Sequence, residues 1–255
     1  MLCPVPKMEI FMTCRLAIFD LDGTVLDTLP DLAAAINHAL ALHGLPARPN
    51  DTIRRFISNG VKKLVERSIY VPQKAMDAVA ADTSDAFLKV IDDYTVKEPE
   101  LFKAVHADFA SYYLGHAAVF TVPYPGIKET LDQLKSAGIR LAMVTNKRDD
   151  VAHEIMERYF PGYFEIIIGD REGHPRKPAP DSVLEILERL GVGAEEAVYI
   201  GDSNVDIETA QNAGVDSIAV TWGYRDFSFL LNTGARAFVT QPQELAKLLQ
   251  SRAFS

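Results

Sequence analysis

Cysteine is scarce in this sequence, in which only Cys3 and Cys14 occur among 255 residues. Both lie in or beside the N-terminal segment, and two cysteines cannot supply a disulfide framework or a cysteine-based zinc site. A chain that does not depend on disulfides suits a reducing compartment, so we expect a cytoplasmic location.

Positive charge is also in the minority, because 26 lysines and arginines stand against 35 aspartates and glutamates, for a net charge of −9. No basic stripe stands out, which argues against nucleic acid and anionic membrane as partners. Long hydrophobic runs are missing too, and none approaches the roughly 20 apolar residues of a membrane span. Residues 1–14 lack the continuous apolar core of a signal peptide, so we expect an N-terminal extension in which Met8 or Met12 is an alternative start.

A short apolar segment that ends on acids is the most informative stretch. Residues 16–19 are too few for a helix and precede a glycine turn, which predicts a buried strand. The carboxyl ends of strands in an α/β sheet face the ligand crevice, so Asp20 and Asp22 should lie at its floor, with Gly23 turning the chain away. Two acids so close repel each other unless a cation such as Mg²⁺ lies between them or one keeps a proton.

Two alternatives for this stretch stay open. A calcium-binding EF-hand loop also begins with Asp-x-Asp, but its glycine is sixth and a helix precedes it, whereas here the glycine is fourth and a strand precedes it. The second alternative is an acidic turn that has neither a catalytic nor a metal-binding role.

Helical periodicity fills the next part of the chain. Between Asp27 and Ala118 apolar residues recur at helical spacing, for example at Val105, Phe109 and Tyr113, and no convincing strand is found. After a proline-rich linker at 121–126, helices alternate with short apolar strands, which we expect at 139–145, 164–168, 197–200, 217–220 and 237–239. This alternation predicts an α/β fold with a doubly wound parallel sheet.

The change of pattern also predicts the domain organisation. We expect one α/β core domain formed by residues 15–27 and 120–255, because the strand at 16–19 needs partners in the later sheet. An all-helical domain at 28–119 interrupts it, and the extension at 1–14 precedes it.

Polar side chains follow three of the later strands. Thr145-Asn146 can hold phosphoryl oxygens, Lys177 in a proline-containing loop can supply a point charge, and Asp202 and Asp206 add carboxylates at a strand end and in the next helix turn. Each signal alone has an ordinary alternative, namely a strand-to-loop transition, a solvated lysine or a helix cap. Together they predict an acid cluster with one cation and hydroxyl donors at one edge of the sheet.

Four segments now resemble the four motifs of the haloacid dehalogenase-like (HAD) phosphohydrolases, in the same order. They are Asp20-Leu21-Asp22-Gly23-Thr24, Thr145-Asn146, Lys177-Pro178 and Gly201-Asp202-Ser203-Asn204-Val205-Asp206. The resemblance runs from about Arg15 to the C-terminus and implies a HAD-like, Rossmannoid core with an inserted helical cap. Residues 56–67 and Tyr124-Pro125-Gly126 are similar to the phosphoglycolate phosphatase-like branch, although Ser58 stands where a glycine is usual.

The resemblance implies a covalent mechanism. Asp20 would attack phosphorus and form an aspartyl-phosphate, and Asp22 would protonate the leaving alcohol and then deprotonate the attacking water. The implied cofactor is Mg²⁺, held by Asp20, Asp202 and the backbone carbonyl of Asp22, with Asp206 supporting the metal through water.

The same resemblance suggests the substrate contacts. Thr145, Asn146 and Lys177 would bind the non-bridging phosphoryl oxygens. On the cap, Asn59 and Lys63 are candidate substrate-binding residues together with Lys62 and Arg67, although each such residue is more often an ordinary exposed side chain.

We therefore expect a Mg²⁺-dependent phosphomonoester hydrolase that acts on a small phosphorylated metabolite, with 2-phosphoglycolate as the best single candidate. In this superfamily, members that cleave C–Cl or C–P bonds lack an acid at the position of Asp22, so its presence favours a phosphatase or a mutase. A sugar-phosphate mutase resembling beta-phosphoglucomutase and an inorganic pyrophosphatase stay open, and a non-enzymatic HAD-like binding protein is least favoured. The assembly is expected to be a monomer or a homodimer.

Overall fold

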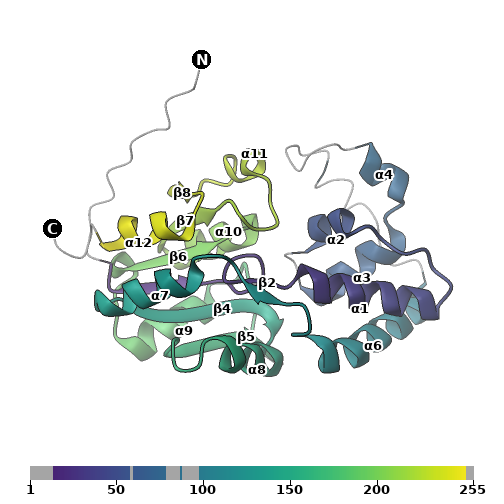
Figure 1. Ribbon diagram of the computed structural model, residues 1–255, viewed down its shortest axis with the longest axis horizontal. Helices are drawn as coiled ribbons and strands as arrows, with labels where there is room; N and C mark the ends of the chain where they lie inside the picture. Colours follow the sequence, from purple (N-terminus) through teal and green to yellow (C-terminus); the bar gives the residue numbers. More distant parts are fainter. Residues whose placement is uncertain (1–13, 58–59, 79–86, 88–97, 251–255) are drawn as a thin grey trace, which may run out of the picture.

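The computed structural model describes residues 14–57, 60–78, 87 and 98–250. The described residues form two regions, an α/β core and a helical cap beside it, seen on the left and right of Figure 1. The predicted division at residues 27/28 and 119/120 is not tested by these observations and stays a prediction.

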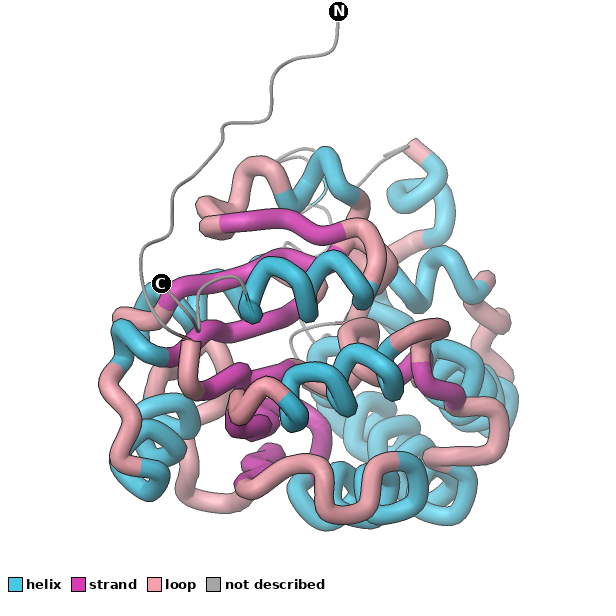
Figure 2. Tube along the Cα trace, turned by 60° about the vertical axis from the view of Figure 1, so that its left-hand side comes forward, coloured by secondary structure: helices cyan, strands magenta, loops and turns pink. Residues whose placement is uncertain are grey.

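The core is built on one six-stranded sheet, whose strands are among the magenta segments of Figure 2. Every neighbouring pair of strands in this sheet is parallel. Its strand order is β5-β4-β1-β6-β7-β8. The strands are β1 (Leu16–Phe19), β4 (Arg140–Arg148), β5 (Ile166–Asp170), β6 (Ala197–Gly201), β7 (Asp216–Val220) and β8 (Ala237–Val239). The predicted doubly wound parallel sheet is thus confirmed, and β1 lies inside it between β4 and β6.

Helices cover both faces of this sheet because residues along β1 alternate between them. Leu16 and Ile18 pack in one cluster with α9 (Asp181–Leu190) and α10 (Asn204–Ala213). Ala17 and Phe19 belong to a second cluster, which includes α7 (Ile127–Ser136), α8 (Asp149–Tyr159) and α12 (Pro242–Gln250). Two single turns complete the core, η1 (Ala194–Glu196) and α11 (Phe227–Leu230).

The inserted region is helical, as expected, and no strand is found among its described residues. Its described helices are α1 (Leu29–Leu42), α2 (Asn50–Phe56), α3 (Val61–Tyr70), α4 (Gln73–Asp77) and α6 (Pro99–His116). A small antiparallel pair, β2 (Leu26–Asp27) with β3 (Val122–Pro123), carries the chain out of the core and back. None of the described helices combines the length and the apolar character that a membrane span requires.

One strand differs from the sequence prediction in a way that matters for the site. The predicted strand ends at Thr145, whereas β4 continues to Arg148, with a register shift against β5 between Val144 and Arg148. Residues 145–148 are polar and therefore do not look like strand on hydropathy alone. In the structure Thr145 and Lys147 are buried while Asn146 and Arg148 are more exposed, which is the alternation of a strand.

Candidate active site

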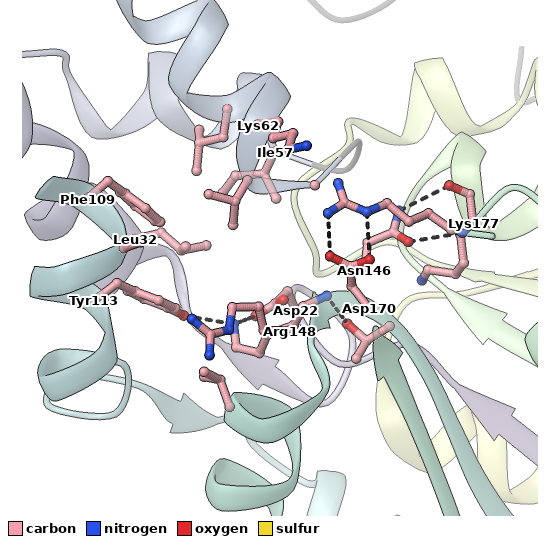
Figure 3. A pocket seen from close by; sticks show the side chains of 18 of the residues that line it. Asp22, Leu32, Ile57, Lys62, Phe109, Tyr113, Asn146, Arg148, Asp170 and Lys177 are labelled. Carbon is pink, nitrogen blue, oxygen red and sulfur yellow. Dashed lines mark hydrogen bonds and ion pairs between the residues drawn. The ribbon is translucent and has the colours of Figure 1, made fainter. Parts of the chain in front are cut away.

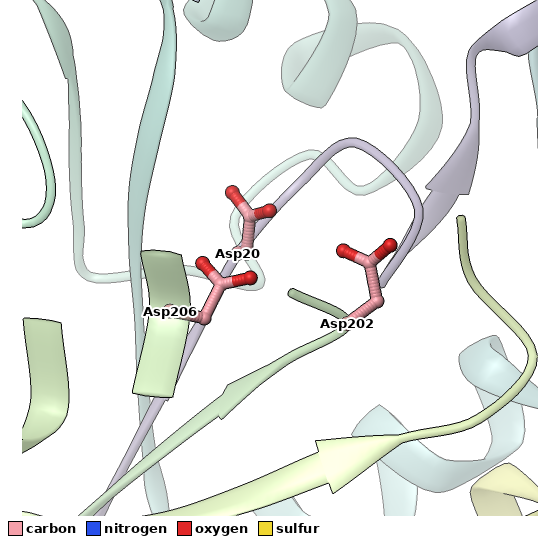
Figure 4. A group of neighbouring side chains, drawn as sticks. All are labelled: Asp20, Asp202 and Asp206. Atoms are coloured by element: carbon pink, nitrogen blue, oxygen red, sulfur yellow. The ribbon is translucent and has the colours of Figure 1, made fainter. Parts of the chain in front are cut away.

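Three carboxylates converge at the carboxyl edge of the sheet (Figure 4). Asp20 follows β1, Asp202 follows β6 and Asp206 lies in the first turn of α10, and one oxygen of each lies within 4.8 Å of the others. All three residues are buried. Such a set of hard oxygen donors suits a divalent cation such as Mg²⁺. Asp206 also accepts hydrogen bonds from Ser203 N and Oγ, so it caps α10 at the same time.

A glycine allows this close approach. Gly23 has a φ of +87°, a conformation that L side chains rarely adopt, and a Cβ atom there would lie 2.5 Å from Oδ2 of Asp202. Glycine at this position therefore lets the first acidic turn pack directly against Asp202.

Burial and mutual repulsion raise the pKa values of two carboxylates in the cluster. Burial, with the repulsion from Asp206 and Asp202, raises the pKa of Asp20 well above its usual range, although Lys177 opposes the shift. Burial, followed by repulsion from Asp206, raises the pKa of Asp202 from 3.8 to about 7. A divalent cation would reverse both shifts, since it favours the ionised form of every carboxylate around it.

Lys177 is the buried cation of this cluster. Its Nζ lies 2.8 Å from Oδ1 of Asp20 and 2.7 Å from Oδ1 of Asp206, and it donates to the hydroxyl of Tyr199 over 3.1 Å. Asn146 fixes the lysine backbone, because its Oδ1 accepts from Lys177 N over 3.0 Å and its Nδ2 donates to Lys177 O over 3.2 Å. The Asn146 amide, which we expected to bind phosphoryl oxygens, thus holds the backbone of Lys177 through both its oxygen and its nitrogen.

Asp22 is held apart from the three converging carboxylates. Its Oδ1 accepts from Lys147 Nζ over 2.7 Å and from Thr28 Oγ1 over 2.5 Å, whereas its Oδ2 has no hydrogen-bond partner among the described residues. The second donor of Lys147 goes to the hydroxyl of Tyr113 on α6, also 2.7 Å away. Lys147 was not predicted as a site residue from the sequence. The feature that could have indicated it is its spacing of two residues from Thr145 on the same strand.

A cavity of about 280 Å³ lies between these core residues and the cap. Figure 3 shows Leu32, Phe109 and Tyr113 on its cap side and Asn146 and Lys177 on its core side. The core wall is polar and includes Thr145, while several apolar cap residues line the opposite wall, namely Leu32, Ile57, Val61, Leu64 and Phe109.

The cap contacts expected from sequence are distributed unevenly. Lys62 lines the cavity, whereas Lys63 is outside the lining and pairs with Glu66 over 3.0 Å. Arg67 is buried and donates to the backbone oxygen of Phe56 over 2.8 Å, which is a packing role within the cap. Asn59 lies outside the described residues.

These features define a hydrolase class that the sequence comparison also finds. A family model described as haloacid dehalogenase-like hydrolase matches residues 17–220. The chain belongs to this family, as the motif resemblance predicted. It resembles the phosphoglycolate phosphatase-like branch, and it is an enzyme of the phosphatase type.

Individual relatives support that assignment. The chain is 32% identical to a phosphoglycolate phosphatase of Aquifex aeolicus over 239 residues, covering 93% of this chain and 97% of the relative. It is 34% identical to that of Neisseria meningitidis over 213 residues, covering 83% and 82%.

Solved structures share the whole architecture. A crystal structure from Lactobacillus delbrueckii subsp. bulgaricus, proposed to be a phosphoglycolate phosphatase, has a TM-score of 0.82 and 34% identity over 93% of this chain and 99% of its own. One from Thermotoga maritima, proposed to be a beta-phosphoglucomutase, has a TM-score of 0.61 and 26% identity over 93% and 99%.

Proposed function

We propose that the enzyme hydrolyses phosphomonoesters with Mg²⁺ through an aspartyl-phosphate on Asp20, and that its substrate is 2-phosphoglycolate. The observation that carries the chemistry is the buried cluster in which Lys177 contacts Asp20 and Asp206 within 2.8 Å, with Asp20 and Lys177 in the cavity wall. The names of the relatives in the phosphoglycolate phosphatase-like branch support the substrate.

The first half-reaction transfers the phosphoryl group to the protein. A carboxylate oxygen of Asp20 attacks phosphorus in line, the bond from phosphorus to the ester oxygen breaks, and Asp22 gives a proton to the departing alkoxide. Thr145 and Lys177 bind the non-bridging oxygens, with Asn146 holding Lys177 in place. The free Oδ2 of Asp22 fits this role, because its Oδ1 is fixed by two donors.

The second half-reaction returns the enzyme to its starting state. Asp22, now ionised, takes a proton from water as that water attacks the phosphorus of the aspartyl-phosphate. The acyl-phosphate bond breaks, inorganic phosphate leaves and Asp20 becomes a carboxylate again. The apolar cap wall keeps bulk water away from the reacting atoms while the substrate is bound.

The side chains of Asp20, Asp202 and Asp206 suit a Mg²⁺ ion, with the backbone carbonyl of Asp22 as a further ligand and Asp206 acting directly or through water. The bound ion supplies positive charge that offsets the repulsion between the nucleophile and the phosphoryl oxygens.

A mutase is the second candidate, because the Thermotoga maritima structure shares the fold over almost the whole chain. Glucose 1-phosphate separates the two activities. A phosphatase releases inorganic phosphate from it, whereas a mutase produces the 6-phosphate. Release of phosphate from pyrophosphate in preference to monoesters would indicate the pyrophosphatase alternative.

The proposed nucleophile is tested with p-nitrophenyl phosphate, which needs no knowledge of the natural substrate. We expect Asp20→Asn to lower kcat by about 10⁴-fold or more, and EDTA to abolish turnover until Mg²⁺ is restored. Circular dichroism of the variant serves as the folding control. Substantial turnover by Asp20→Asn would remove Asp20 as the nucleophile.

A further inference from the structure

Two buried hydrogen-bond donors from different regions meet in the wall of the cavity. Lys147 comes from β4 in the core and Tyr113 from α6 in the cap, and Lys147 Nζ donates to the Tyr113 hydroxyl over 2.7 Å. The lysine side chain is 4% exposed and the tyrosine residue 6% exposed. Both residues line the cavity, and Figure 3 shows Tyr113 directed towards Asp22.

Each of these groups retains one unused hydrogen. A lysine ammonium has three N–H donors, and those of Lys147 reach Asp22 Oδ1 and the Tyr113 oxygen, which leaves one without an acceptor in the described part of the chain. The Tyr113 oxygen accepts from Lys147, and its own hydrogen likewise has no acceptor among the described residues. Burial raises the pKa of Tyr113 to about 12, so the phenol keeps this hydrogen at neutral pH.

The two donors meet at one point of the cavity wall, and each keeps one hydrogen that an acceptor entering the cavity can use. A carboxylate satisfies both, since its two oxygens accept parallel hydrogen bonds and its charge complements the ammonium. Of the other cations at the cavity wall, Arg148 pairs with Asp150 and Arg176 with Asp170, whereas Lys62 is exposed on the cap.

The place of the donor pair fits a short leaving group. Under the proposed function Asp22 protonates the ester oxygen, which requires a separation of about 3 Å. Because Lys147 shares Oδ1 of Asp22 at 2.7 Å, the first atoms of the leaving group lie beside Lys147. In 2-phosphoglycolate a single methylene separates the ester oxygen from a carboxylate.

We propose that Lys147 Nζ and the Tyr113 hydroxyl together bind the carboxylate of the leaving group, and so select phosphomonoesters that carry a carboxylate one carbon from the ester oxygen. This proposal rests on the proposed phosphatase function and adds the residues that determine its specificity. Because one donor belongs to the core and the other to the cap, the bound carboxylate connects the two regions.

The test compares 2-phosphoglycolate with ethyl phosphate, which has the same carbon skeleton and no carboxylate. The wild-type enzyme should prefer 2-phosphoglycolate in kcat/KM, and Lys147→Gln should lower that preference by about tenfold or more. Tyr113→Phe, which removes a single oxygen, should lower it by about three- to tenfold, mainly through KM. Tyr112→Phe on the same helix is the matched control and should leave the preference unchanged.

If Lys147 and Tyr113 served only to hold Asp22 in place, their substitution would lower kcat/KM for both substrates by the same factor. An unchanged preference in Lys147→Gln and Tyr113→Phe, or a wild-type enzyme that does not prefer 2-phosphoglycolate, overturns the carboxylate site. If glucose 1-phosphate is preferred to both, a sugar rather than a carboxylate occupies the pocket, and the proposal fails.

Binding without turnover separates this proposal from the proposed reaction. In the Asp20→Asn background with Mg²⁺, isothermal titration should give a dissociation constant for 2-phosphoglycolate that rises about tenfold on adding Lys147→Gln or, to a smaller extent, Tyr113→Phe. The dissociation constant for ethyl phosphate should not change. Equal weakening for both ligands, or no binding of 2-phosphoglycolate, contradicts the carboxylate site whether or not p-nitrophenyl phosphate is hydrolysed.

Discussion

The two walls of the cavity are built in different ways. On the core wall, charged side chains are paired over short distances, as Asp20 is with Lys177 and Asp22 with Lys147. On the cap wall, apolar side chains such as Leu32, Leu64 and Phe109 predominate. Charge of defined geometry can stabilise a phosphoryl transfer, whereas an apolar wall excludes water and selects the shape of the leaving group. Under the proposed function, the core wall carries the chemistry and the cap wall the specificity, and Lys147 and Tyr113 lie where the two walls meet.

Apart from loss of the nucleophile itself, the largest effect should come from removing the buried cation of the core wall. Lys177→Met should lower kcat/KM by about 10²- to 10³-fold, because the phosphoryl oxygens lose a preorganised charge. The loss should be equal for 2-phosphoglycolate and ethyl phosphate, since both present the same phosphoryl group. A larger loss of kcat/KM for 2-phosphoglycolate than for ethyl phosphate would place part of the leaving-group site at Lys177. The separate roles of the core wall and the cap wall would then no longer hold.

A second prediction concerns pH and metal binding. Because the pKa of Asp202 is about 7 in the folded metal-free protein and about 4 in the unfolded chain, the folded state binds more protons between these values. The stabilisation from this proton is therefore present at acidic pH and lost as the pH rises through about 7. Mg²⁺ requires the ionised carboxylate, so saturating Mg²⁺ should raise Tm more at about pH 8 than at about pH 5.5.

Differential scanning fluorimetry with and without Mg²⁺ measures this difference. The variant Asp202→Asn, which has no titrating carboxyl at the position, is the matched control and should lose most of the dependence. Equal Mg²⁺-induced shifts at both pH values in the wild type would contradict a metal site at Asp202.

Whether a site residue could be predicted from the sequence depends on where it lies along the chain. Asp20, Asp22, Asp202 and Asp206 could be recognised because each closes or follows a short apolar strand, and strand ends of a parallel sheet meet at one edge. The sheet itself followed from the alternation of helices and strands. Local patterns of this kind need no knowledge of distant contacts.

Lys147 and Tyr113 could not be recognised in the same way. Lys147 lies 125 residues from its partner Asp22, and no local pattern in the sequence connects them. Tyr113 fits the apolar periodicity of its helix, and its ring does stack on Phe109 with centroids 5.3 Å apart. Only the tertiary structure shows that its hydroxyl reaches Lys147. The same limit explains why Lys62 and Lys63 could not be told apart from sequence.

The smallest effect on the kinetics should come from substituting Lys63. Lys63 is exposed on α3, pairs with Glu66 and lies outside the cavity lining. We therefore expect Lys63→Gln to change KM for 2-phosphoglycolate by less than about twofold, as surface substitutions usually do little. Steady-state kinetics beside wild type measures it. A rise in KM of about fivefold or more would extend the substrate site beyond the present cavity and weaken the assignment of its walls.

The most direct measurement of the central claim is the chemical identification of the phosphorylated residue. Enzyme quenched during turnover of p-nitrophenyl phosphate is treated with borohydride, which reduces an aspartyl-phosphate to homoserine, and the peptides are analysed by mass spectrometry. The account predicts homoserine at position 20 in the wild type and none in Asp20→Asn. Homoserine at another aspartate, or phosphate on a different residue type in an active enzyme, would contradict it.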